Sequence, residues 1–135
     1  MRFKPDDAEI CFNLGIAFSF VAQSEKTIEQ LEQALRLRPA YPDAHFNLAV
    51  TLAKIGRLTE AIEHYRQAIQ LRPDFFEAYD NMAEAYSSMN RMDEAIAAAQ
   101  KALEIAKSGT AFSGLTKVLE ARIQYYRAVQ ASWTK

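Results

Sequence analysis

The chain has 135 residues, of which 50% are hydrophobic and 24% are charged, and its formal net charge is −1. Nucleic-acid binders that track phosphates usually carry a basic excess, so this charge argues against that class. The longest apolar run falls far short of the ~20 residues that span a membrane. The single cysteine, Cys11, excludes an internal disulfide and fits a reducing, cytoplasmic compartment.

The chain begins with a segment that reads as the end of a structural unit. Pro5, Pro39 and Pro73 follow one another at intervals of 34 residues. The same interval relates three further sets, which are Asn13, Asn47 and Asn81; Leu14, Leu48 and Met82; and Ala34, Ala68 and Ala102. Such a period indicates a repeat protein. Residues 1–7 are therefore expected to be the tail of a preceding repeat in a chain cut from a longer array, with a naturally short start as the alternative.

Residues 8–41, 42–75 and 76–109 are the three expected repeats, and each predicts a pair of amphipathic helices. In the second repeat, apolar residues recur at spacings of three and four on both sides of Gly56. Gly56 can adopt a positive φ, which a tight turn between two helices requires. Pro73 cannot continue a helix, so it marks the end of this repeat.

The period fails after Gly109, and residues 111–132 predict one long amphipathic helix instead. A stack of repeats leaves an apolar face on its last member, which a terminal helix can cover. Good helix formers dominate the composition, and glycine and proline are scarce. We therefore expect an all-α protein, a single domain over residues 1–135, that forms an α-solenoid of three helix-turn-helix repeats plus a C-terminal capping helix.

The repeated positions resemble the tetratricopeptide repeat (TPR) family, whose pattern is W-x₂-L-G-x₂-Y, then A-x₃-F, then P. In the second repeat the matching residues are Leu48, Ala49, Leu52, Ala61, Tyr65, Ala68 and Pro73. The departures are Thr27 at a position that holds alanine in the other repeats, Cys11 and His45 at an aromatic position, and Lys107 in place of a proline. The extra volume of Thr27 is expected to open the first hairpin slightly.

The resemblance implies that the first helix of each repeat lines a concave inner face. It places Asn13, Asn47 and Asn81 on that face at one register. Asparagine is a poor helix former, so three at one position call for an explanation. Their amides could satisfy the backbone of an extended peptide, because an amide both donates and accepts, and the row resembles the asparagine ladder of O-linked N-acetylglucosamine transferase. Alternatively, each amide bonds a neighbouring helix inside the array.

Apolar and acidic residues share the expected inner face. Phe12, Ile16 and Phe20 form an apolar stripe that Phe46 and Val50 extend. We expect Phe46 and Val50 to form a groove for apolar side chains of a partner, and Phe20 to be covered by a preceding repeat or another copy of the chain. Acidic residues in the third repeat favour a basic partner. The predicted peptide-binding residues are Phe12, Asn13, Phe46, Asn47, Val50, Glu77, Asp80, Asn81 and Glu84.

The sequence contains no catalytic constellation, and we expect no enzyme, no cofactor and no metal site. His45 and His64 lack further ligands at metal-binding spacing, so they are expected to be packing or surface residues. Cys11 has no nearby histidine and is expected to be an inert thiol.

The TPR subtype that clamps the carboxylate of chaperone C-termini needs lysine, arginine and asparagine at positions that here include Phe12, Ile16 and Glu77. Two apolar residues and an acid cannot hold a carboxylate, so chaperone tails are not expected as partners. The leading hypothesis is a noncatalytic module that binds a protein or peptide, with neither nucleic acid nor membrane as a partner. Two alternatives stay open. One is a homo-oligomer formed through the N-terminal repeat, and the other is a substrate-recruiting segment of a larger transferase.

Overall fold

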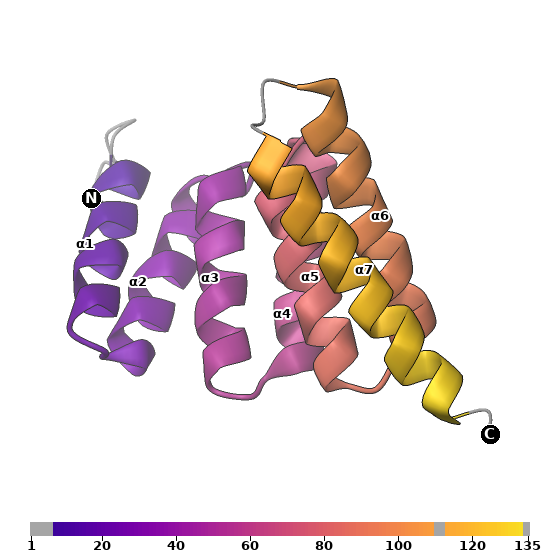
Figure 1. Ribbon diagram of the computed structural model, residues 1–135. Helices are drawn as coiled ribbons and strands as arrows, with labels where there is room; N and C mark the ends of the chain where they lie inside the picture. The colour runs from indigo at the N-terminus through magenta and orange to yellow at the C-terminus, as the bar shows by residue number, and fades with distance from the viewer. Residues whose placement is uncertain (1–6, 110–112, 134–135) are drawn as a thin grey trace. The chain divides into compact units, whose positions relative to one another are not determined.

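The computed structural model describes residues 7–109 and 113–133, and within them the chain contains seven α-helices and no strand (Figure 1). In chain order the helices are α1 (Asp7–Phe20), α2 (Ser24–Leu37), α3 (Pro42–Lys54), α4 (Leu58–Leu71), α5 (Phe76–Ser88), α6 (Met92–Ser108) and α7 (Ser113–Trp133). The expected all-α fold is confirmed. Except for Asp7, the expected tail at residues 1–7 lies outside the described residues, as do residues 111 and 112 of the expected capping helix.

The helices form two compact units along the chain. Unit 1, Met1–Arg72, contains α1 to α4, and unit 2, Pro73–Lys135, contains α5 to α7. In unit 1, α1 pairs with α2 and α3 pairs with α4, while α2 also packs against α3 (Figure 1). In unit 2, α5 pairs with α6, and α7 lies along α6 (Figure 1).

The turn inside each helix pair repeats one backbone geometry. Ala22, Gly56 and Asn90 adopt positive φ angles of 56°, 85° and 61°. The next residue in each turn donates its backbone N–H to the carbonyl oxygen five residues earlier, over 2.9 to 3.1 Å. This is the Schellman arrangement, which satisfies carbonyl groups at a helix end. Among the three residues, only Gly56 avoids the steric cost that a Cβ atom brings in this region.

The hairpin of α1 and α2 is close-packed at Gly15 and accommodates Thr27. A Cβ atom added to Gly15 would lie 3.0 Å from Leu31 Cγ, so the Leu31 side chain would have to shift to admit a larger residue. Thr27 is 1% exposed, and its hydroxyl donates to the Gln23 carbonyl oxygen over 3.1 Å. The buried hydroxyl is therefore satisfied within its own helix end.

Each unit has its own apolar core. In unit 1 the most deeply buried large side chains include Leu31, Leu48, Leu52 and Tyr65. In unit 2, Leu119 of α7 packs on Ala102 and Ala106 of α6, and Tyr79, Leu103 and Leu115 pack against this cluster. The small alanines let α7 approach α6 closely, and the buried residues Leu119, Ile123 and Tyr126 follow the spacing of one helix face.

Candidate binding faces

The predicted site residues lie on three helices. Those on α1 and α3, which we call the unit 1 face, are Phe12, Asn13, Phe46, Asn47 and Val50. Those on α5, which we call the unit 2 face, are Glu77, Asp80, Asn81 and Glu84. Asn13, Glu77 and Glu84 are exposed, and the others are half-buried.

Two aromatic rings of the unit 1 face are fixed by other rings of the same unit. The Phe12 centroid lies 5.1 Å from that of Tyr41, with 46° between the ring planes. The Phe46 centroid lies 6.0 Å from that of Tyr65, with 59° between the planes. Tilted pairs at such distances are favourable. Each phenylalanine is therefore held in place while part of it stays accessible, which suits an apolar anchor.

The three asparagines share a register in the sequence but differ in environment. Asn47 donates from Nδ2 to the Asp43 backbone carbonyl oxygen over 2.8 Å, and the backbone carbonyl oxygen of Asn47 accepts from the Thr51 hydroxyl over 2.9 Å. The Asn47 amide is thus anchored to its own helix and not to a neighbouring one. No described residue donates a hydrogen bond to its Oδ1 atom. Asn13 is exposed and Asn81 is half-buried.

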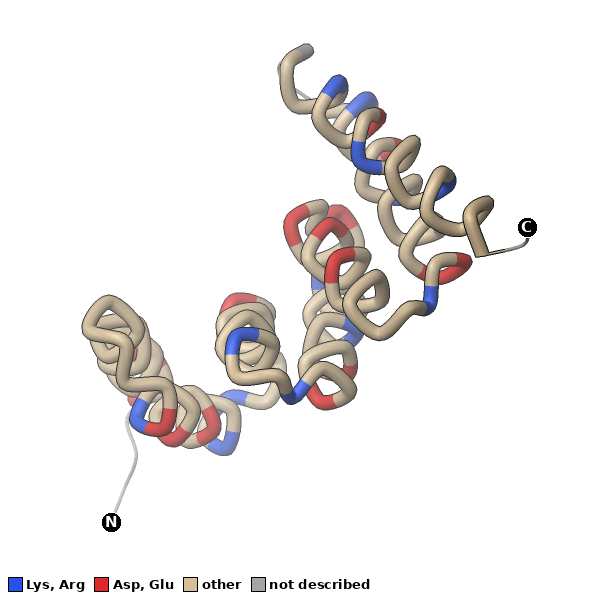
Figure 2. Tube along the Cα trace, turned by 60° about the horizontal axis from the view of Figure 1, so that its bottom comes forward, with Lys and Arg blue, Asp and Glu red and all other residues tan. Residues whose placement is uncertain are grey.

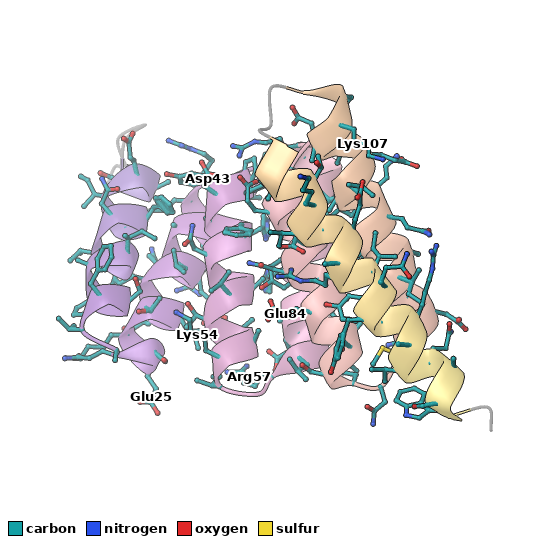
Figure 3. All side chains as sticks on the ribbon, in the orientation of Figure 1. Glu25, Asp43, Lys54, Arg57, Glu84 and Lys107 are labelled. Carbon is teal, nitrogen blue, oxygen red and sulfur yellow. The ribbon has the colours of Figure 1, made fainter. Side chains whose placement is uncertain are left out.

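Charged residues mark the two ends of α3. Asp43 at its start forms an ion pair with Arg72, with 3.2 Å between Oδ1 and Nη1. Lys54 at its end is exposed, and Figure 3 labels Asp43 and Lys54 at opposite ends of the helix. Any ligand that follows α3 would therefore meet a neutralised acid at one end and a lysine at the other.

On the unit 2 face, Asp80 is engaged by the last helix of the chain. The Arg122 guanidinium of α7 donates to Asp80 Oδ1, and their side chains are only 30% and 21% exposed. Figure 2 shows acidic positions on α5 and basic positions along α7. Burial raises the pKa of the nearby Tyr126, an effect that Arg122 opposes and that Glu84 and Asp80 reinforce. The carboxylates that stay exposed on this face are those of Glu77 and Glu84.

The two histidines, expected from the sequence to be packing or surface residues, contact each other. His45 Nδ1 on α3 lies 3.0 Å from His64 Nδ1 on α4. The sequence offered one signal for this pair, because antiparallel helices in a hairpin bring residues from the two sides of the turn face to face. Within the described residues, no group of three or more histidine, cysteine or acidic side chains is arranged to hold a metal ion. Among the same residues, no helix is both long and apolar enough to cross a membrane.

Helix pairs that share one turn geometry and a 34-residue period define the chain as a helical repeat protein. The family model described as TPR repeat matches residues 23–56 and 51–90, and that described as tetratricopeptide repeat matches residues 76–108. The chain therefore belongs to the tetratricopeptide repeat family, whose repeats are protein-interaction modules. No curated protein matches the sequence.

Solved structures share this fold. A crystal structure of MamA is 30% identical with a TM-score of 0.75, over 78% of this chain and 61% of that one. The type III secretion translocator chaperone SycD of Yersinia enterocolitica is 14% identical with a TM-score of 0.87, over 96% of this chain and 90% of that one. The first TPR of Spaghetti (RPAP3), bound to the HSP90 peptide SRMEEVD, is 14% identical with a TM-score of 0.81, over 96% of this chain and 99% of that one. The present chain spans about three fifths of the MamA chain.

Proposed function

We propose that the chain is a noncatalytic interaction module that binds an extended peptide, or one helix of a partner, on its unit 1 face. The observation that carries this proposal is the arrangement on α3. There the anchored amide of Asn47 lies next to the half-buried Phe46, and Val50 follows one turn later. Polar and apolar groups are thus combined on one accessible helix face.

The two kinds of group would take different parts of the ligand. The Nδ2 group of Asn47 is already engaged with the Asp43 carbonyl, so the amide would meet a ligand through its Oδ1 atom. This oxygen can accept a hydrogen bond from an N–H of a peptide backbone. The exposed Asn13 offers a second amide on α1. Phe46 and Val50 would contact alternate side chains of an extended segment, which supply the specificity that backbone bonds lack.

The unit 2 face is a separate surface, and its exposed Glu77 and Glu84 would favour basic or neutral segments over acidic ones there. Peptide binding by this fold has a precedent in the RPAP3 domain, but the peptide in that structure, SRMEEVD, is acidic at its C-terminal end. Phe12 and Ile16 of α1 are apolar and cannot hold the carboxylates of such a peptide, so chaperone tails are not among the ligands that we propose.

A random peptide library displayed on phage provides the probe. Peptides selected on the wild-type chain should lose about tenfold or more in affinity on Phe46→Ala, because a central aromatic anchor often contributes ~2 kcal/mol. The matched control is Gln70→Ala, an exposed position on α4, which should change the affinity by less than about twofold. Equal affinity of a correctly folded Phe46→Ala variant would refute the proposal.

The exposed face of α1 favours a second candidate function, self-association through a second copy of the chain. Ile10 and Leu14 are 54% and 44% exposed. Their equivalents one repeat later, Ala44 and Leu48, are 0% and 1% exposed in unit 1, where α2 packs against α3. The α1 face therefore has the apolar character of a helix face that is covered elsewhere in the same unit.

Light scattering over a range of concentrations tests this second candidate. A dimer formed through α1 should dissociate on dilution, and Leu14→Glu should shift the equilibrium to the monomer. The control is Glu25→Lys, an exposed position on α2. A wild-type chain that remains monomeric at every concentration would exclude it, and so would a dimer that Leu14→Glu leaves intact.

A further inference from the structure

A pair of histidines lies outside both candidate faces and has no part in the proposed function. The Nδ1 atoms of His45 and His64 are 3.0 Å apart, and the ring planes are 28° from parallel. His45 is 5% exposed, and its other ring nitrogen, Nε2, lies 3.0 Å from the Pro39 carbonyl oxygen. The pair thus connects α3, α4 and the segment between α2 and α3, all within unit 1.

The Pro39 carbonyl fixes where the protons lie in the neutral pair. A carbonyl oxygen only accepts, so His45 must carry its proton on Nε2 and offer Nδ1 as an acceptor. His64 must then donate from its own Nδ1 to fill the short contact between the rings. One arrangement of tautomers therefore satisfies every contact of the neutral pair.

The geometry accepts one added proton but not two. His45 as a cation can donate to Pro39 from Nε2 and to His64 from Nδ1, provided that the proton of His64 moves to its Nε2. With a second proton, both Nδ1 atoms would carry hydrogen, and two cationic rings would face each other at 3.0 Å. Such like charges disfavour double protonation strongly.

The surroundings act in the same direction. Burial lowers the pKa of His45, although its bond to the Pro39 carbonyl opposes this effect. Burial also lowers the pKa of His64, His45 lowers it further, and Glu63 and Glu60 oppose both. Both carboxylates are exposed on α4. Apart from the histidines themselves, they are the described charged groups that shift the pKa values of the pair. A surface cavity of about 450 Å³ is lined in part by His45, Glu63 and Gln67, and it lets water reach the histidine pair.

We propose that His45 and His64 form a pH-sensitive latch, which ties the hairpin of α3 and α4 to the Pro39 segment at neutral pH and opens when both rings become protonated. In the unfolded chain both histidines take up protons below about pH 6.5. The folded chain excludes at least one of them, so stability is fully present above that pH and is lost as the pH falls below it. Each excluded proton changes the unfolding equilibrium by about tenfold per pH unit.

The first experiment is an NMR titration of the imidazole nitrogens in the wild-type chain. We expect the Nε2–H tautomer for His45 and the Nδ1–H tautomer for His64 at neutral pH, and two separate steps below the ordinary pKa on acidification. Two independent titrations near pH 6.5, or an Nε2–H tautomer of His64 at neutral pH, would overturn the proposal. This experiment needs no variant, so it does not depend on the folding of one.

The second experiment compares unfolding by urea at about pH 7.5 and about pH 5. The variant His45→Tyr with His64→Ala reproduces Tyr79 and Ala98, which occupy the equivalent positions in the third repeat. The wild-type unfolding equilibrium should shift toward the unfolded state by about tenfold or more beyond the shift of the variant. The same shift in both chains would show that other groups cause the pH dependence, and it would contradict the proposed latch.

Discussion

Asn47 donates from its side-chain Nδ2 to the backbone carbonyl oxygen of Asp43, one turn earlier in α3, over 2.8 Å. This bond fixes the amide on the surface of its own helix. It also explains how an asparagine is tolerated in a helix interior, since the side-chain NH₂ group finds a hydrogen-bond partner in the preceding turn without disrupting the helix. The same bond orients the amide and leaves Oδ1 as the atom that we propose contacts a peptide.

Asn47→Ala should therefore separate stability from binding. The variant loses one hydrogen bond that contributes about 1 kcal/mol but gains helix propensity, so the free energy of unfolding should change by less than about 1 kcal/mol. Affinity for a selected peptide should fall at the same time. Urea denaturation and fluorescence anisotropy measure the two quantities. A loss of several kcal/mol in stability would show instead that the amide has a structural role that the Asp43 contact does not capture.

The repeated turn predicts opposite effects at equivalent positions. Ala22→Gly should stabilise the chain by about 0.5 to 1 kcal/mol, because it relieves a Cβ atom from a positive φ of 56°. Gly56→Ala should destabilise it by about 1 to 2 kcal/mol. A Cβ atom at Gly56 meets no other atom within 4 Å, so backbone strain alone would be responsible. If urea denaturation gives the same sign for both, the shared turn geometry is not what sets these energies.

Burial on one face of α7 predicts a strong contrast between adjacent residues. Leu119 is 1% exposed and packs on Ala102 and Ala106, whereas Val118 is 54% exposed. Leu119→Ala should lower the free energy of unfolding by about 2 to 4 kcal/mol, and Val118→Ala by less than about 0.5 kcal/mol. Thermal or urea unfolding measures both. Comparable losses for the two variants would contradict the packing of α7 on α6.

The Asp80–Arg122 ion pair should contribute more to the free energy of unfolding than an exposed ion pair does. A double-mutant cycle with Asp80→Ala and Arg122→Ala should give a coupling of about 1 kcal/mol or more, because both side chains are largely buried. The matched pair within one helix end, Arg91 and Glu94, is 45% and 41% exposed and should couple by less than about 0.5 kcal/mol. Equal couplings would mean that the burial of Asp80 adds nothing.

The helices were predictable from the sequence because residues 34 positions apart occupy the same position in successive repeats. The turn at Gly56 was predictable because glycine can adopt a positive φ. The partner of Asp80 was not predictable. Arg122 is 42 residues away on α7, and its position depends on how α7 packs against α6 through Leu119, which the sequence pattern does not specify. The contact between His45 and His64 likewise depends on ring rotamers and on the spacing of two helices, neither of which a periodic pattern specifies.

The most direct test of peptide binding on the unit 1 face is photo-cross-linking with a peptide selected from the random library. The photoreactive residue p-benzoylphenylalanine replaces Phe46 in one preparation and Gln70 of α4 in the other. We predict an efficient cross-link to the peptide from position 46, competed by unlabelled peptide, and none from position 70. A competed cross-link from position 70 with none from position 46 would place the ligand elsewhere and contradict the proposed binding face.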